Sequence, residues 1–219
     1  MSDEWQAWKG VSTCTVSDAL DRLRIAGQCL GIRLVHGSAA IVGRAMTVRM
    51  VPIGQARGTV GDYIDDVPEG YVVVIDNGGR LDATVWGDIL TAVAHRRGVA
   101  GTVIHGVCRD LSTSKELNYP IFSRGNYMRT GKDRVQAEDF NVPISLGEIR
   151  VEPGDLIVGD DDGVVVVPKQ REREVLENAL QVHAAENRIR DAVAKGARLD
   201  RARREFGYFD LQGASEEGA

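Results

Sequence analysis

Two short apolar segments separated by a helical stretch constrain the fold of this chain more than any other feature. Residues 71–75 (YVVVI) and 102–104 (TVI) lack the polar–apolar alternation of a half-exposed strand, so we expect strands buried on both faces. Between them, residues 83–97 have helical spacing, with Ile89, Ala92 and Val93 on one side and Gly98 as a stop. This order predicts a right-handed crossover between two parallel strands.

The rest of the chain predicts a second kind of architecture. An extended segment spans residues 41–51, and short strands are expected at 121–122, 143–146, 149–151, 156–158 and 164–167. These short strands lie too close together for intervening helices, so we expect antiparallel hairpins. A capping-box pattern at residues 15–18 predicts an early helix. A charged helix runs from about 169 to 196, with a short one at 201–206. Together, these predicted strands and helices indicate a layered α/β fold.

Composition excludes several classes of protein. Of the 219 residues, 43% are hydrophobic and 27% are charged, a balance that permits a substantial core. The net charge of −5 is unlike the basic footprint of a nucleic-acid-binding protein. Three cysteines without a C-x-x-C pair indicate neither a disulfide framework nor a zinc knuckle. With no signal-peptide pattern and no apolar run of about 20 residues, we expect a cytoplasmic protein without a membrane partner.

The pair Arg109-Asp110 is the strongest chemical signal in the chain. It closes a glycine-flanked turn after the second buried strand and places a cation beside a carboxylate. Such a pair can hold an anionic substrate with one residue and a divalent metal ion with the other. An ordinary surface ion pair is the alternative interpretation.

Gly87-Asp88-Ile89-Leu90 stands near a predicted helix start. The unpaired amides of residues 87–90 and the helix dipole favour an anion there, and a substrate carboxylate fits that requirement. Asp88 is equally consistent with an acidic residue that only complements the dipole.

Glu186 interrupts an apolar stripe on the predicted C-terminal helix. The other members of the stripe are Val175, Ala179, Val182, Ile189 and Val193. A carboxylate in such a stripe is costly unless it is paired, linked to a metal or placed at an edge. An edge position or an ion pair with Arg190 therefore stands beside a functional role.

Other motifs favour structural interpretations. The segment 76–79 (DNGG) lacks the spacing of a phosphate-binding loop and predicts a turn. The segment 160–163 (DDDG) lacks the ligand pattern of a calcium loop and predicts a hairpin. The chain has no G-x-S-x-G motif, and its four histidines share no metal-ligand spacing, so a nucleophilic triad is poorly supported.

Taken together, these segments resemble the family of 4-hydroxy-4-methyl-2-oxoglutarate / 4-carboxy-4-hydroxy-2-oxoadipate aldolases, which shares its fold with the regulator of ribonuclease E activity A. The matching segments are 16–20 (VSDAL), 42–45 (VGRA), 87–90 (GDIL), 98–110 (GVAGTVIHGVCRD), 119–122 (YPIF) and 153–164 (PGDLIVGDDDGV). They cover nearly the whole chain. The combination is specific, although each segment alone is weak.

The resemblance implies a fold and an assembly. We expect a β/β/α swivelling-type sandwich over residues 1–168 that carries catalysis, followed by a helical extension over 169–212 that packs on a neighbouring subunit. The expected oligomer is a homotrimer or homohexamer.

The resemblance also implies roles for individual residues around Mg²⁺ or Mn²⁺. Asp110 is expected to ligate the metal directly, while Asp88 and Glu186 act through water, with Glu186 supplied by the adjacent subunit. Arg109 is expected to hold the pyruvyl ketone and carboxylate. The backbone at Gly87, Ile89 and Leu90 is expected to bind that carboxylate. A water oriented by Asp88 is the expected base.

Two departures from the family pattern affect the expected activity. Thr113 stands where an acidic residue is expected, and His105 occupies a position that is often aspartate. The leading hypothesis is a metal-dependent pyruvate aldolase that cleaves 4-hydroxy-2-oxo acids and also decarboxylates oxaloacetate. The alternatives are a non-catalytic regulator that binds another protein, or a lyase or decarboxylase acting on another oxo acid. No adenosylmethionine-type glycine loop supports a methyltransferase.

Overall fold

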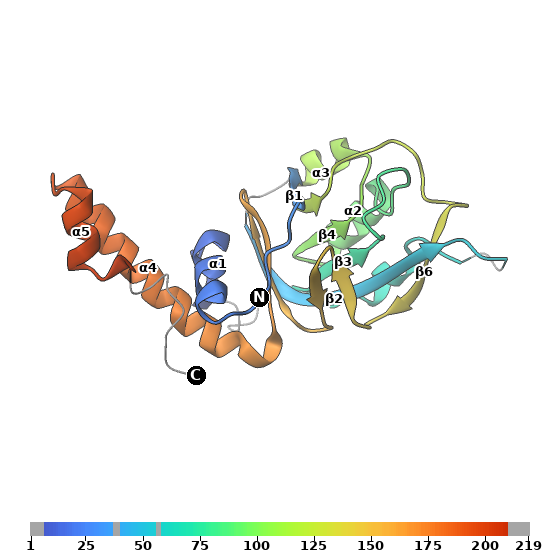
Figure 1. Cartoon of the computed structure of the whole chain (residues 1–219). Coiled ribbons are helices and arrows are strands. Elements are labelled where there is room, and N and C mark those ends of the chain that lie inside the picture. Colours follow the sequence, from blue (N-terminus) through green and yellow to red (C-terminus); the bar gives the residue numbers. More distant parts are fainter. Residues whose placement is uncertain (1–6, 37–39, 56–57, 210–219) are drawn as a thin grey trace.

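The computed structural model describes residues 7–36, 40–55 and 58–209, and Figure 1 shows their arrangement. In chain order the elements are α1 (Thr13–Arg22), β1 (Arg33–His36), β2 (Ile41–Pro52), η2 (Asp62–Asp66), β3 (Val72–Asp76), α2 (Asp88–Arg96), β4 (Gly101–His105), α3 (Leu111–Leu117), β5 (Ile121–Ser123), β6 (Val135–Phe140), β7 (Ile144–Leu146), β8 (Ile149–Val151), β9 (Leu156–Asp160), β10 (Gly163–Val167), η3 (Lys169–Arg171), α4 (Glu172–Ala194) and α5 (Leu199–Glu205).

One sheet organises the molecule. Its strand order is β1-β5-β4-β3-β2-β9-β10, and β6 also pairs with β2. Strands β2 to β5 run parallel, with α2 between β3 and β4, which confirms the predicted crossover. The long strand β2 pairs with β9 along its first half and with β6 along its second half. The predicted layered α/β fold is therefore confirmed.

The side chains of β3 alternate between two layers because successive residues point to opposite faces of a sheet. Val73 and Ile75 pack on the face covered by η2 and α2, together with Trp86. Val72 and Val74 pack on the other face, against the small β7–β8 sheet. The two layers bury Val72–Ile75 completely, which explains the uninterrupted apolar sequence of these residues.

The N-terminal and C-terminal helices form a third layer on the β9–β10 hairpin. Val175 and Ala179 of α4 pack with Val16 and Leu20 of α1 in one buried cluster. Figure 1 shows α1 between α4 and the sheet, with the far end of α4 and α5 extending away from the body. The first half of α4 thus packs on its own chain, and packing of the extension on a neighbouring subunit stays a prediction.

The helix boundaries differ from the sequence-based ones for local reasons. Helix α1 begins at Thr13, because Ser12 rather than Thr15 caps it and accepts the Thr15 N–H. Helix α2 begins at Asp88 rather than near residue 83. The preceding segment is extended instead, since Thr84 bridges to residues 107 and 130.

The strand predictions were correct for the last two hairpins, and the strand predicted at 121–122 exists as β5, but its expected hairpin pairing was wrong. The pairs β7–β8 and β9–β10 are antiparallel, as expected. Strand β5 is parallel to β4, because the short helix α3, absent from the prediction, carries the chain across. Strand β6 was also not predicted. In the described part of the chain, no helix combines the length and apolar character needed to cross a bilayer.

Candidate active site

The first amides of helix α2 lie at one edge of the sheet and have no partner within the helix backbone. Gly87 is the N-cap, and the first helical hydrogen bond runs from the Thr91 N–H to the Gly87 carbonyl over 3.0 Å. The Thr91 hydroxyl also donates to that carbonyl and accepts the Trp86 indole N–H, both over 2.9 Å. These bonds fix the helix end, where the amides of residues 88–90 have no helical partner and can donate to carboxylates or to a bound anion.

Asp110, the residue before α3, occupies an unusual backbone conformation. Its φ and ψ are 57° and 43°, in the left-handed region that non-glycine residues rarely adopt. The Arg109 amide donates to the Trp86 carbonyl over 3.0 Å, which ties this turn to the segment before α2. The strained turn is thereby held so that the Asp110 carboxylate faces the α2 N-terminus.

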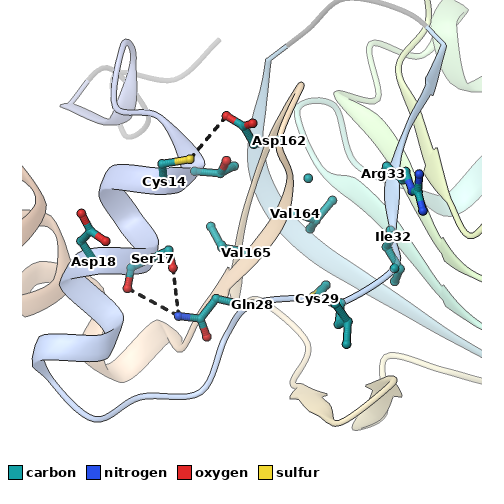
Figure 2. Close-up of a pocket in the computed structure, with 14 residues that line it drawn as sticks. Cys14, Ser17, Asp18, Gln28, Cys29, Ile32, Arg33, Asp162, Val164 and Val165 are labelled. Atoms are coloured by element: carbon teal, nitrogen blue, oxygen red, sulfur yellow. Dashed lines mark hydrogen bonds between the residues drawn. The ribbon is translucent and has the colours of Figure 1, made fainter.

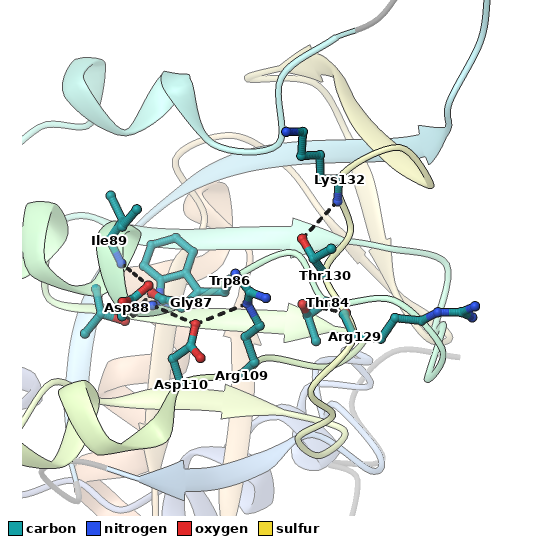
Figure 3. A network of polar contacts seen from close by, with 11 residues as sticks. Thr84, Trp86, Gly87, Asp88, Ile89, Arg109, Asp110, Arg129, Thr130 and Lys132 are labelled. Atoms are coloured by element: carbon teal, nitrogen blue, oxygen red, sulfur yellow. Dashed lines mark hydrogen bonds and ion pairs between the residues drawn. The ribbon is translucent and has the colours of Figure 1, made fainter.

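Arg109, Asp110 and the amide of Asp88 form one connected group (Figure 3). Arg109 Nε lies 3.1 Å from Asp110 Oδ2, and the Asp88 amide nitrogen lies 3.4 Å from the same oxygen. The Arg109 and Asp110 side chains are both partly exposed, at 38% and 37%. The structure therefore brings together the predicted pair and the predicted helix start, and leaves the Arg109 fork accessible.

Gly87 is required for this approach. A Cβ atom at residue 87 would lie 2.7 Å from Asp110 Oδ2, closer than real contacts allow. The absence of a side chain lets the carboxylate reach the helix end, which is a physical reason for the Gly-Asp sequence at this position.

The Asp88 carboxylate turns back onto its own helix. Its Oδ1 accepts the Ile89 N–H over 2.8 Å, so one of the two amides expected to bind a substrate carboxylate is already capped. No hydrogen bond to the Leu90 amide is found within the described residues. Asp88 acts here as a helix-terminal acid, and it must release the Ile89 amide before a ligand can use it.

A cavity of about 390 Å³ opens beside these groups. Its walls include Gly87, Asp88, Ile89, Leu90 and Arg109 from the predicted site. The opposite wall comes from residues 58–62 and from the loop 130–133. Sequence reasoning missed this loop, because its residues share no spacing with the other site residues. The volume lies within the range of small-molecule pockets.

The donor set is compatible with a magnesium-type ion. The described residues contain no group of three or more Asp, Glu, His or Cys side chains that could enclose a metal. Asp88 is a wall residue of the cavity, and Asp110, which is not one of the wall residues, supplies a second carboxylate beside Arg109. Mg²⁺ is commonly held by one or two carboxylates and keeps several waters, so these residues fit such an ion.

Glu186 does not join this group within one chain. It lies on α4, and Figure 1 shows α4 and α2 at opposite ends of the molecule. Its side chain is 25% exposed, and its carboxylate lies 3.3 Å from Arg190 Nη1. Glu186 stands at the edge of a stripe whose buried members are Val175, Ala179, Val182, Ala185 and Ile189. Within the chain, the edge position and the Arg190 pair are both confirmed. A role for Glu186 at a neighbour's site stays a prediction.

The two residues that depart from the family pattern lie outside the cavity. His105 Nδ1 is 3.4 Å from the Asp76 carboxylate, at the ends of β4 and β3. Thr113 is in the first turn of α3, where its amide donates to the Asp110 carbonyl over 3.3 Å. Neither residue is among those that line the cavity with Arg109.

The other aspartate-glycine and cysteine positions are structural. The segments 76–79 and 160–163 form the predicted turn and hairpin. Burial raises the pKa of the Cys108 thiol next to Arg109, which keeps it protonated and poorly nucleophilic. All three cysteines are free thiols.

A second cavity, of about 570 Å³, lies between α1 and β10 (Figure 2). Its polar side chains bond to one another: the Gln28 amide donates to the Ser17 hydroxyl over 3.1 Å, and Cys14 Sγ lies 3.4 Å from Asp162. No residue of the predicted site lines it.

Comparisons with known proteins place this geometry in context. The family described as RraA-like: Aldolase/RraA matches residues 13–166. Protein DlpA of Legionella pneumophila is 40% identical over 200 residues, which are 90% of this chain but 32% of DlpA, so the chain spans about a third of that relative. A Halalkalibacterium halodurans protein named "Putative 4-hydroxy-4-methyl-2-oxoglutarate aldolase" is 36% identical over 89% of this chain and 90% of its own.

Solved structures agree with the sequence relatives. An uncharacterized protein from Pseudomonas syringae pv. tomato superposes with a TM-score of 0.85 at 43% identity, over 90% of this chain and 95% of its own. Streptomyces coelicolor RraAS2, described as an unusual member of the RNase ES inhibitor RraA protein family, superposes with a TM-score of 0.77 at 27% identity. That match covers 85% of this chain and 96% of RraAS2.

Proposed function

This chain belongs to the RraA-like family of aldolases and RraA proteins, and on that basis we propose that it is a divalent-metal-dependent pyruvate aldolase. It cleaves 4-hydroxy-2-oxo acids into pyruvate and a second carbonyl compound. Oxaloacetate decarboxylation accompanies this activity, because loss of CO₂ from oxaloacetate generates the same pyruvate enolate.

The observation that carries the proposal is the contact of Asp110 with Arg109 and with the start of α2, next to a cavity that Arg109 and the α2 residues line. A purely structural ion pair needs neither the left-handed backbone of Asp110 nor the missing side chain at Gly87. Strain of this kind costs of order 1–3 kcal/mol and clusters at functional sites. In this chain the strained residue is Asp110, whose carboxylate reaches the helix end, where a ligand site would need it.

The reaction needs the chain to bind the pyruvyl end, to offset the enolate charge and to accept the hydroxyl proton. Cleavage removes the proton from the 4-hydroxyl, breaks the C3–C4 bond and leaves its electron pair on the pyruvate enolate, which is then protonated at C3. Arg109 binds the pyruvyl end and offsets the enolate charge with its planar fork of donors. The Leu90 amide, and the Ile89 amide once Asp88 releases it, bind the carboxylate. Asp88 is then free to orient the water that accepts the hydroxyl proton.

The implied metal ion is Mg²⁺ or Mn²⁺, with Asp110 as the residue that would hold it directly and Asp88 through water. When bound, such an ion supplies Lewis-acid stabilisation of the negative charge that develops on the substrate oxygens.

We propose that the site is shared between subunits of a homotrimer or homohexamer. Within the described residues, no third acidic side chain forms a metal-binding group with Asp110 and Asp88, and Glu186 lies on the remote helix α4. In a closed ring, each subunit can give α4 to one neighbour and its Asp110 turn to another. Glu186 from the adjacent chain then adds a third carboxylate through water.

Non-catalytic regulation of another protein is the second candidate function. The likeness to RraAS2, whose description names an inhibitor family, favours it. A regulator needs neither a metal ion nor the Asp110 carboxylate, which separates the two proposals.

The test is pyruvate release from oxaloacetate and several 4-hydroxy-2-oxo acids, with Mg²⁺ or with EDTA. We expect activity that disappears in EDTA and returns with Mg²⁺ or Mn²⁺. Undiminished turnover in the chelator would refute the metal-dependent mechanism. Absence of pyruvate from every substrate would favour the regulator.

A further inference from the structure

Asp76 and His105 stand side by side where the two central strands of the sheet end. Asp76 is the last residue of β3, His105 is the last residue of β4, and the parallel register pairs them directly. Val74 and Val103, two residues earlier, pack with Leu146 of β7. Because alternate residues of a strand share a face, the two polar side chains lie on the same face as the β7–β8 hairpin. Both are largely covered, at 19% and 16% exposed.

Nδ1 of His105 has two neighbours that require opposite protonation states. It lies 3.4 Å from Asp76 Oδ1, and an ionised carboxylate can only accept a hydrogen bond. It also lies 3.4 Å from the amide nitrogen of Gly147, which donates its N–H toward the ring. A protonated Nδ1 can donate to Asp76, and an unprotonated Nδ1 can accept from Gly147. No single protonation state of Nδ1 makes both hydrogen bonds.

The hairpin is also anchored to Asp76 independently of the histidine ring. The Ser145 N–H donates to Asp76 Oδ2 over 3.2 Å, and the Gly78 N–H donates to Asp76 Oδ1 over 2.9 Å. These two bonds hold the carboxylate in place in either state of His105. Gly147, at the exposed tip of the hairpin, has open space around its Cβ position, so the tip can move without a clash. The bond from Gly147 to Nδ1 is therefore the contact that His105 can make or release.

Charged groups on the elements around the ring define its electrostatic surroundings. They are Asp76 of β3, Arg124 after β5, Glu148 in the β7–β8 turn, the Arg80–Asp82 pair after β3, and the Arg49–Asp139 pair of β2 and β6. A Cβ at Gly79 would lie 2.9 Å from His105 Nε2 and 2.8 Å from Arg124 Nη1, so this cation stands near the far side of the ring. Asp76 favours the imidazolium, whereas Arg124 favours the neutral ring.

We propose that His105 is a pH-sensitive switch that holds the tip of the β7–β8 hairpin. When the ring is neutral with its proton on Nε2, Nδ1 accepts the Gly147 N–H and the tip is held on the sheet. When the ring is an imidazolium, Nδ1–H donates to Asp76 as an ion pair, and the Gly147 N–H loses its acceptor. The tip then detaches while Ser145 stays bonded to Asp76. Histidine titrates between about pH 5 and 8, so the tip is held at the upper end of this range and released at the lower end.

Amide hydrogen exchange of the intact full-length protein tests this switch. NMR gives the protection of the Gly147 and Ser145 amides, corrected for the intrinsic pH dependence of exchange, and also the titration of the His105 ring. From about pH 8 to about pH 5, the protection of Gly147 should fall roughly 3- to 10-fold, as expected for one lost hydrogen bond. The midpoint of this fall should equal the midpoint of the His105 ring titration. The protection of Ser145 should stay constant.

His105→Asn removes the titrating ring, so the pH dependence at Gly147 should disappear. His95→Gln is the matched control, because His95 is an exposed histidine of α2, and the pH dependence should be unchanged in this variant. A pH dependence that persists in His105→Asn, or that is lost in His95→Gln, would overturn the inference.

The wild type alone also decides the matter, so a poorly folded His105→Asn does not prevent a conclusion. Constant protection of Gly147, a midpoint that differs from the ring titration, or an equal loss of protection at Ser145 would each overturn the switch. None of its residues belongs to the candidate active site, so the result is independent of the aldolase proposal.

Discussion

Two aspartate-bearing turns of this molecule look alike in sequence and differ in where their oxygens point. In the β9–β10 hairpin, Asp160 accepts the Thr13 amide and hydroxyl over 2.8 and 2.5 Å, and the Asp162 amide over 3.0 Å. After β4, Asp110 has a strained backbone and offers one oxygen to Arg109 and to a distant amide. A carboxylate with its acceptor capacity used internally stabilises the fold, whereas one held under strain with capacity to spare is available to a ligand.

The sharpest test of this comparison is Asp110→Asn. If Asp110 ligates a metal, turnover should fall by about 10³-fold or more, because a metal ion contributes several kcal/mol to the transition state. The free energy of unfolding should change by less than about 0.5 kcal/mol, since asparagine tolerates the left-handed region. Pyruvate release and urea denaturation measure the two effects. A variant that unfolds easily would make Asp110 a structural residue like Asp160.

Arg109→Lys probes the partner of Asp110. Lysine keeps the charge and loses the planar fork, so kcat/KM should fall by about 10²–10³-fold with little change in stability. Steady-state kinetics in saturating Mg²⁺ provide the measurement, and Arg124→Lys, on an exposed arginine outside the cavity, is the control. Kinetics equal to the wild type would mean that Arg109 is a surface ion-pair partner only.

Gly87→Ala tests the close approach between the Asp110 turn and α2. The added Cβ would displace the partly exposed Asp110 carboxylate, so we expect activity to fall by about 10-fold while stability changes by less than about 0.5 kcal/mol. Gly147→Ala has no neighbour within 4 Å and strains only its own backbone, so it serves as the control in thermal denaturation. Unchanged activity in Gly87→Ala would show that the approach is dispensable.

Asp160→Ala should produce the reverse of the Asp110 result. Loss of the bonds to the start of α1 should cost about 1–2 kcal/mol of stability. Turnover at a temperature where the variant is folded should match the wild type. Denaturant midpoints and pyruvate release together decide the matter, and a selective loss of turnover would contradict the structural assignment of this turn.

The parts of the fold that sequence reasoning found are those with strong periodicity. The apolar run of β3 is compatible only with a buried element, and the aspartate-glycine turn before β10 favours a hairpin. Helix α3 was missed because it has only seven residues and starts after a left-handed residue, which no capping pattern announces. Strand β6 was missed because exposed acidic residues such as Glu138 obscure its single buried position, Val135.

The candidate site also contains residues that sequence reasoning could find and residues that it could not. Arg109, Asp110 and Gly87 could be found because the ends of a strand and a crossover helix meet at one edge of a parallel sheet. The position of the cavity loop 130–133 depends on hydrogen bonds from Arg134 and Thr84, which are far apart in sequence. Its nearest sequence signal was Gly131, whose close packing becomes visible only in three dimensions. The self-capping of Asp88 likewise depends on a rotamer that spacing does not encode.

The double pairing of β2 has a consequence for the order in which the chain folds. Its first residues, Ile41–Arg44, pair with Leu156–Gly159, more than 110 residues later, while Ala45–Arg49 pair with the nearby β3. During synthesis the crossover β3–α2–β4 can assemble as soon as it emerges, but the start of β2 must wait for β9. Closure of the sheet over such long separations is slow, so the late step of folding is the docking of the β9–β10 hairpin. The nascent chain carries an unpaired strand edge until then.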